Sequence, residues 1–205
     1  MQSFRFLAFV GPVVCVLAGP SLGGGKEDEK DFVRLFNGKD LAGWKTHPGA
    51  PGDWKVDQKI LIGSGKRFSH LFTVKDDWKD VHVRVEARIN AKGNSGVHAR
   101  APFAARLGDL GYEAQIADRA GERTGTLFIH RAPAVVVNDE LAPPNTWFVE
   151  DLIVRDHRVI IRVNGKTVVD HVDKEGVWKS GHIALQMHDP STFVQFKKVL
   201  AKELR

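Results

Sequence analysis

The sequence predicts an all-β protein built as a two-sheet antiparallel sandwich, and three observations support this fold class. About a dozen short segments alternate apolar and polar residues, which places successive side chains on opposite faces of a strand. Turn residues separate these segments at intervals of roughly 8–12 residues, as in sandwiches and jelly rolls. No segment shows a convincing helical period in its apolar residues.

The segment 81–90 has the clearest alternation, with Val81, Val83, Val85, Ala87 and Ile89 on one face and polar residues on the other. The other predicted strands, in chain order, are 32–36, 54–62 (a strand pair or one bent strand), 68–74, 94–100, 111–118, 126–131, 147–155, 158–163, 167–172, 181–188 and 193–203. Asn164-Gly165 is the strongest hairpin signal. Residues 132–145 contain Pro133, Pro143 and Pro144 and predict a loop.

The first 18 residues predict a secretory signal peptide. Arg5 precedes the short apolar run Phe6–Ala18, which is too short to span a bilayer comfortably and ends in small residues. Pro12-Val13-Val14 before Cys15 is a poor lipobox, so the sequence argues against a lipoprotein anchor. The protein is therefore expected to be secreted or periplasmic, with no membrane attachment after cleavage.

The predicted organisation is a signal peptide at 1–18, a flexible tether at 19–30 and a β-sandwich domain at 31–205. Signal cleavage would remove Cys15, the single cysteine, so burial rather than a disulfide must stabilise the mature protein. Loss of Arg5 would lower the formal net charge from +5 to +4. No basic run is interleaved with aromatic residues, so we expect no nucleic-acid partner. The sequence does not indicate an oligomeric state.

Strand alternation predicts one exposed face that carries hydrogen-bonding side chains from three segments. These residues are Asn94, His98 and Arg100 from the first segment, Glu113 and Gln115 from the second, and Gln186 and His188 from the third. Sugars are recognised by such amides, carboxylates and arginines, because paired hydroxyls both donate and accept hydrogen bonds. The set therefore indicates a small oligosaccharide or glycoside ligand. Trp147 is a further candidate, because its ring could stack on a sugar.

Other chemistries have less support in the sequence. The G-x-S-x-G nucleophile elbow, the C-x-x-C and H-E-x-x-H zinc spacings and a glycine-rich phosphate loop are absent. The E-x-D-x-x-E triplet of laminarinase-type glucanases is absent too, so two-carboxylate hydrolysis is not indicated. No cofactor is predicted. A divalent metal stays open, since His98, His188 and Asp118 could meet in three dimensions.

Several motifs together resemble the 3-keto-disaccharide hydrolase domain family. They are F-V-R-L-F-N-G-K-D-L-A-G-W (32–44), N-S-G-V-H-A-R (94–100), G-Y-E-A-Q-I-A-D (111–118), T-G-T-L-F (124–128), V-N-G (163–165) and I-A-L-Q-M-H (183–188). The resemblance covers about residues 31–204 in the expected order. The chain departs from the family at Trp147-Phe148, where Trp-Asn is common, and at Phe128-Ile129-His130.

The resemblance implies a concanavalin A-like jelly roll that acts on glycosides oxidised at carbon 3 of the sugar. Such a ketone acidifies the hydrogen on carbon 2, so one base and donors for an enolate oxygen would suffice. Glu113 and His188 are both candidates for the base. Arg100, with Gln115 or Gln186, would hold the oxyanion or sugar hydroxyls, and Asp118 would orient a partner if the strand ends or bulges there.

Two non-enzymatic functions compete with this interpretation. The first is a carbohydrate-binding module of the same fold, which would usually present exposed aromatic side chains as a platform. The second is a structural cell-surface domain whose polar face meets another protein. The abundance of Glu, Gln, His and Arg on the predicted face favours the enzyme.

Overall fold

The computed structural model describes residues 29–105 and 111–205. The predicted signal peptide and most of the predicted tether lie outside these residues. The last two tether residues begin a short 3-10 turn, Glu29–Asp31, which is tied to the body by ion pairs from Lys198 to Glu29 and from Lys202 to Asp31. No helix in the described part of the chain is long and apolar enough to cross a membrane.

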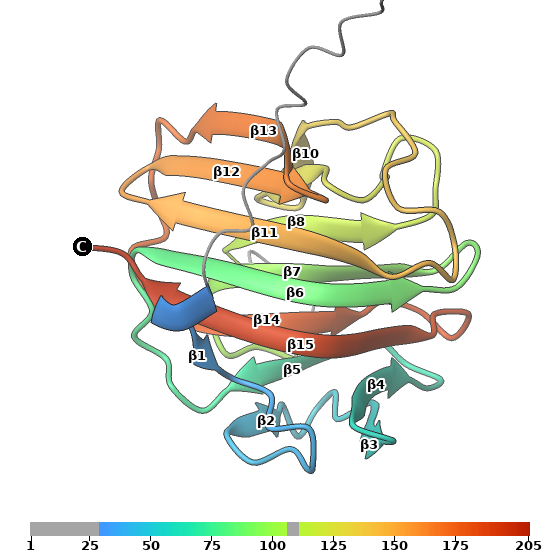
Figure 1. Cartoon of the computed structure of the whole chain (residues 1–205). Helices are drawn as coiled ribbons and strands as arrows, with labels where there is room; N and C mark the ends of the chain where they lie inside the picture. Colours follow the sequence, from blue (N-terminus) through green and yellow to red (C-terminus); the bar gives the residue numbers. More distant parts are fainter. Residues whose placement is uncertain (1–28, 106–110) are drawn as a thin grey trace, which may run out of the picture.

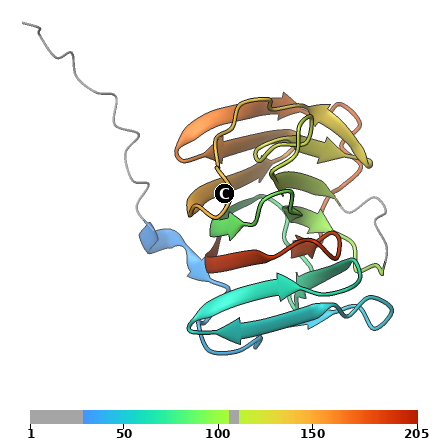
Figure 2. The same ribbon diagram turned by 90° about the vertical axis from the view of Figure 1, so that its right-hand side faces the viewer.

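Two antiparallel sheets form the protein, as the sequence predicts (Figure 1). Sheet A contains, from edge to edge, β13 (Lys166–Val172), β12 (Arg158–Val163), β11 (Phe148–Arg155), β6 (Val81–Ile89), β15 (Val194–Glu203), β4 (Ile60–Ser64) and β3 (Asp53–Asp57), with β1 (Val33–Arg34) also paired to β15. Sheet B contains β10 (Ala132–Val135), β9 (Leu127–Ile129), β8 (Tyr112–Ala117), β7 (Asn94–Ala101), β14 (His182–Met187), β5 (Ser69–Thr73) and β2 (Trp44–Thr46). Figure 2 views the same layers after a 90° turn.

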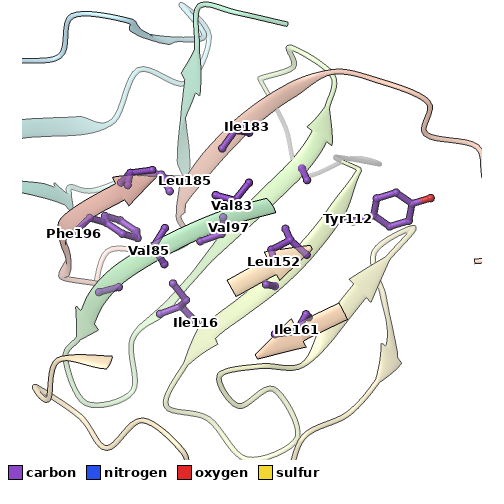
Figure 3. Close-up of a cluster of buried hydrophobic side chains, with 14 of the residues drawn as sticks. Val83, Val85, Val97, Tyr112, Ile116, Leu152, Ile161, Ile183, Leu185 and Phe196 are labelled. Carbon is purple, nitrogen blue, oxygen red and sulfur yellow. The ribbon is translucent and has the colours of Figure 1, made fainter. Parts of the chain in front are cut away.

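The core lies between the sheets and is built from the alternate residues of the central strands (Figure 3). Val83 and Val85 of β6 face Val97 of β7 and Ile183 and Leu185 of β14, and each of these five side chains is fully buried or nearly so. Complete burial of such a side chain contributes about 1.5–3 kcal/mol relative to exposure. The opposite positions of the same strands therefore have to face outward.

Local signals explain several of the elements. The 54–62 segment forms the β3–β4 hairpin, and Asn164-Gly165 forms the β12–β13 hairpin with φ of 51° and 81°. Both positive values are those of a type I′ turn, which suits the twist of paired strands and favours Asn-Gly. The predicted loop at 132–145 is wrong at its start, because Ala132–Val135 pairs with β9 as β10. Pro133 is tolerated there because β10 is the edge strand of sheet B.

A carboxyl group is buried among the apolar side chains of the core. Glu150 of β11 lies opposite Val85 and Val163, and its side chain is 1% exposed. Burial raises the pKa of Glu150 well above its ordinary value, and repulsion from Asp151 adds to the rise. Burial therefore favours the protonated, uncharged form of Glu150 in the folded protein.

We predict that Glu150→Gln makes the stability of the protein less dependent on pH. In the unfolded chain Glu150 ionises near the ordinary glutamate pKa of 4.5, whereas in the folded chain it keeps its proton to higher pH. The native state then binds more protons than the unfolded state, so stability falls as pH rises above that value. Thermal unfolding at pH 5 and pH 8 should give a smaller loss of Tm for the variant than for wild type. The exposed control Glu140→Gln should keep the wild-type loss, and equal losses in all three proteins would contradict the prediction.

Candidate functional site

A pocket opens on the outer face of sheet B, where β8, β7 and β14 lie side by side. Its cavity volume is about 320 Å³, within the size range of small-molecule sites. The residues that line it are Asn94, His98, Gly111, Glu113, Gln115, Glu122, Phe128, Arg131, Gln186 and His188. Most of these side chains are polar, as expected for a ligand with several hydroxyl groups.

Strand register arranges the lining residues in two rows across the sheet. In one row Gln186, Gly96 and Gln115 lie directly opposite one another on β14, β7 and β8. In the next row His98 lies opposite Glu113, which in turn lies opposite Phe128 of β9. Side chains that are directly opposite share a face and are close enough to interact. Glu113 therefore has an imidazole on one side and an aromatic ring on the other.

The carboxyl group of Glu113 is held by amides from two neighbouring positions. Gln186 Nε2 donates a hydrogen bond to Glu113 Oε1 over 3.0 Å. With its amide turned so that nitrogen donates, Gln115 Nε2 lies 3.1 Å from the same oxygen and 3.0 Å from the carbonyl oxygen of Ser95. His98 Nε2 lies 3.5 Å from Glu113 Oε1. No hydrogen bond reaches Oε2 from the residues that the structure describes, so this second oxygen is available to a ligand.

A glycine makes room for this carboxyl group. A Cβ atom at Gly96 would lie 2.3 Å from Glu113 Oε1 and 3.0 Å from its Cγ, far inside van der Waals contact. Any larger residue at 96 would push Glu113 away from Gln186. The glycine in the N-S-G-V-H-A-R segment therefore shapes the floor of the pocket.

The environment of Glu113 changes its acid strength. Burial raises the pKa of Glu113 to about 8, with a further rise from repulsion by Glu122, while the hydrogen bond from Gln186 opposes the change. The side chain nevertheless remains 14% exposed, through the pocket. A carboxyl group with a pKa near neutral pH can both accept and return a proton, which suits general acid–base chemistry.

His98 lies beside this carboxyl group, and His70 and His188 extend from it as a cluster of rings. The rings of His98 and His70 meet edge to face with centroids 4.9 Å apart, and Phe68 contacts the rings of both His70 and His188. Burial lowers the pKa of His70 well below its ordinary value, and repulsion from His98 and His188 acts in the same direction. His70 is therefore a neutral ring that packs against the His98 ring. His188 is more open, at 34% exposure, and lies at the rim of the pocket.

The structure brings together six of the nine site residues predicted from the sequence. Asn94, His98, Glu113, Gln115, Gln186 and His188 all line the pocket. Strand alternation on three neighbouring strands accounts for this, because each of the six occupies an outward position. What each residue does chemically stays a prediction.

Arg100 does not reach the pocket, so its expected place on this face is wrong. Its φ is 56°, and the β7–β14 register shifts beside it, so a bulge turns the side chain away from the polar face. The guanidinium is 3% exposed and donates to the carbonyl oxygens of Lys79, Asp156 and Trp178 and to Asp80 Oδ1. Because three of these partners flank strands of sheet A, Arg100 fastens the two sheets together.

Asp118 and Trp147 also lie outside the pocket. Asp118 follows the end of β8, where Oδ2 accepts a hydrogen bond from the Lys92 amide and Oδ1 lies 3.7 Å from Arg123 Nη1. Trp147 stacks against Arg88 and Lys197, whose side chains belong to strands of the other sheet. The grouping of Asp118 with His98 and His188 that the sequence left open is thus not formed. Among the described residues, no group of three or more His, Cys, Asp or Glu side chains is arranged to hold a metal ion.

Four lining residues were not predicted from the sequence, namely Gly111, Glu122, Phe128 and Arg131. Glu122 and Arg131 sit in a loop and a turn, where no alternation signals a facing direction. Phe128 lies in the predicted strand 126–131, and only its pairing with Glu113 places it in the pocket. His70 could have been found, because it alternates with Leu71 and faces outward opposite Gln186.

The sequence profile of the 3-keto-alpha-glucoside-1,2-lyase-like domain matches residues 31–202. No curated protein sequence matches the chain. Among solved structures, a proposed glycosyl hydrolase from Parabacteroides distasonis aligns with a TM-score of 0.70 and 24% identity, over 85% of this chain and 94% of that one.

Two further solved structures share the fold at lower identity. The carbohydrate binding module CBM66 from Bacillus subtilis aligns with a TM-score of 0.62 and 19% identity, over 78% of this chain and 95% of that one. The exoplasmic domain of VIP36, in a form bound to Ca²⁺ and Man3GlcNAc, aligns with a TM-score of 0.59 and 8% identity, over 87% and 90% of the two chains. These similarities support the concanavalin A-like sandwich predicted from the sequence.

We predict that Gly96→Ala moves the Glu113 carboxyl group and lowers its pKa towards the ordinary value. The added methyl would overlap Glu113 Oε1, so the carboxyl group would swing towards solvent and lose part of its burial. Carbon-detected NMR titration of the glutamate carboxyl groups measures this change. The control Gly43→Ala places the same methyl where no atom lies within 4 Å and should leave Glu113 unaffected. An unchanged Glu113 titration in Gly96→Ala would contradict the prediction.

Proposed function

The chain belongs to the 3-keto-alpha-glucoside-1,2-lyase-like domain family, and from this membership and its pocket we propose that it cleaves 3-keto-glycosides. The proposed reaction begins with removal of the proton on carbon 2 of the oxidised sugar. The observation that carries the proposal is Glu113, a pocket carboxyl group held by two glutamine amides and with a pKa raised to about 8. A base of this strength is matched to work near neutral pH.

The proposed steps need only this chain and water. Glu113 as the carboxylate takes the proton from carbon 2, and the electron pair of that bond forms an enolate with its charge on the carbon 3 oxygen. The enolate then restores the ketone and forms a double bond between carbons 1 and 2, while the bond from carbon 1 to the leaving oxygen breaks. The protonated Glu113 returns its proton to that oxygen. Addition of water across the new double bond would complete net hydrolysis.

Hydrogen-bond donors near Glu113 suit the developing negative charge on the carbon 3 oxygen. Gln186 and His98 flank the carboxyl group, and His188 lines the same pocket. Donors aimed at the position of an enolate oxygen are a common means of lowering such a barrier. We assign His188 to this role and Glu113 to proton transfer, so that Glu113 is the proposed base of the two candidates.

A carbohydrate-binding module is the second candidate function. The structural similarity to CBM66 favours it, since that protein is a binding module of the same fold. Among the described lining residues Phe128 is the only Phe, Tyr or Trp, so no aromatic platform is seen there, and the pocket surrounds a carboxyl group of raised pKa. These features support catalysis over binding alone.

We predict that Glu113→Gln and His188→Ala each lower the release of aglycone from a 3-keto-glucoside by about 100-fold or more. In deuterated water, wild type should also exchange the hydrogen on carbon 2 of a 3-keto sugar that lacks a leaving group. Glu113→Gln should lose this exchange, because the amide cannot accept the proton. Mass spectrometry and proton NMR measure both reactions.

The control for these variants is His171→Ala, which removes a histidine from β13 on the other sheet. It should keep wild-type turnover. Binding of an unoxidised glycan without exchange or aglycone release would support the binding module. Full activity in both pocket variants would place the reaction elsewhere.

We predict that kcat/KM rises with pH through a midpoint of about 8. Glu113 must be ionised to take the proton, and its raised pKa means that this form accumulates only as pH approaches and passes that value. A pH profile between 6 and 10 tests this. A profile that falls with pH through the same midpoint would mean that protonated Glu113 starts the reaction as an acid, contrary to the proposed role.

A further inference from the structure

The pocket has chemically different ends on either side of Glu113. Along β8, one end is formed by Asn94 and Glu122, which are joined by a bond of 3.4 Å between Asn94 Nδ2 and Glu122 Oε2. At the other end lie Gly111 and Arg131. Among the lining residues that the structure describes, Arg131 is the only arginine or lysine. A ligand that spans the pocket therefore meets an amide and a carboxylate at one end and a guanidinium at the other.

Arg131 is presented by a strained hairpin. Ile129 pairs with Ala132, so His130 and Arg131 are the two turn residues between β9 and β10, with φ of 51° and 66°. A two-residue turn with both φ positive favours Asn-Gly, as at Asn164-Gly165, whereas bulky residues are strained there. Backbone strain of this kind is common at active sites and in segments that contact a ligand.

Other contacts hold the same hairpin in position. The His130 ring lies 6.0 Å from the ring of Trp178, and its Nε2 lies 3.6 Å from a carboxylate oxygen of Glu175. On the strand before the turn, Phe128 lies directly opposite Glu113. The hairpin thus places an aromatic ring beside the carboxyl group and a cation beyond it.

In the proposed reaction, different parts of the pocket would bind the oxygen on carbon 3 and the group on carbon 1. Carbon 2 must lie over Glu113, and its two ring neighbours, carbons 1 and 3, flank it and carry their substituents in different directions. If the carbon 3 oxygen points to Gln186 and His188, the group on carbon 1 points to Phe128 and Arg131.

We infer that Phe128 and Arg131 form a subsite for the leaving group, and that Arg131 selects glycosides whose leaving group carries a negative charge. This inference rests on the proposed function. A guanidinium forms charge-assisted hydrogen bonds with a carboxylate, while an aromatic ring stacks on a flat leaving group. The substrate class is therefore the 3-keto-glycoside of an acidic, flat aglycone.

The test uses two substrates of nearly the same shape, the 3-keto-glucosides of 4-hydroxybenzoate and 4-hydroxybenzamide. Wild type should cleave the benzoate with a kcat/KM about tenfold or more above that for the benzamide, the size expected of one charged hydrogen bond. Arg131→Gln should reduce this ratio to about one. Arg34→Gln, a control on the exposed strand β1 of sheet A, should keep the wild-type ratio.

A second variant distinguishes loss of the Arg131 charge from a folding defect. His130→Asn combined with Arg131→Gly supplies the preferred turn residues, so it should raise Tm and still lose the preference for the benzoate. A wild-type ratio near one would overturn the inference, as would a ratio unchanged in both variants. A large and equal loss on both substrates in Arg131→Gln would also overturn it, because Arg131 would then act on the reacting sugar.

Binding separates this inference from the proposed function. In the Glu113→Gln background, calorimetry should give a lower Kd for the benzoate glycoside than for the benzamide, and Arg131→Gln should remove the difference. This readout needs no turnover. Absence of aglycone release and of carbon 2 exchange in wild type would refute the proposed function, whereas equal Kd values would refute the subsite.

Discussion

Burial of every second side chain of β7, β8 and β14 between the two sheets determines where the functional groups of this protein must lie. Val97, Ile116 and Leu185 cannot leave the core without losing their burial, so the register of their strands is fixed. A shift by one residue would bury the polar set and expose the apolar one. The apolar face therefore stabilises the fold and, in the same step, gathers amides, imidazoles and one carboxyl group on the outer surface of sheet B.

The same alternation explains which parts of the structure could be predicted from the sequence. It identified the fold class and six pocket residues, because both follow from period and strand neighbourhood. The alternation gave the wrong position for Arg100, because a bulge interrupts the pattern there. It also gave the wrong position for Trp147, because alternation does not show which sheet the following strand joins. Glu122 and Arg131 lie in a loop and a turn, so their direction depends on backbone geometry that no periodic pattern records.

Burial away from water makes Glu113 a stronger base than an exposed glutamate. An exposed glutamate would be a weak base at neutral pH, since its conjugate acid would have the ordinary pKa. Here burial raises that pKa, and the amides of Gln115 and Gln186 fix one oxygen while the other stays accessible through the pocket. Such a group suits abstraction of a proton already acidified by a neighbouring ketone. The proposal of a single carboxyl group as the base fits the absence of the E-x-D-x-x-E triplet.

The edge position of Pro133 has a consequence for assembly. A free strand edge is a template on which a second chain can add its own strand, and long uniform edges promote aggregation. At β10, proline removes one backbone donor, and the pairing with β9 is irregular between Pro133 and Val135. Both features disfavour strand addition at this border. The hairpin that carries Arg131 is therefore a poor template for extension into an intermolecular sheet.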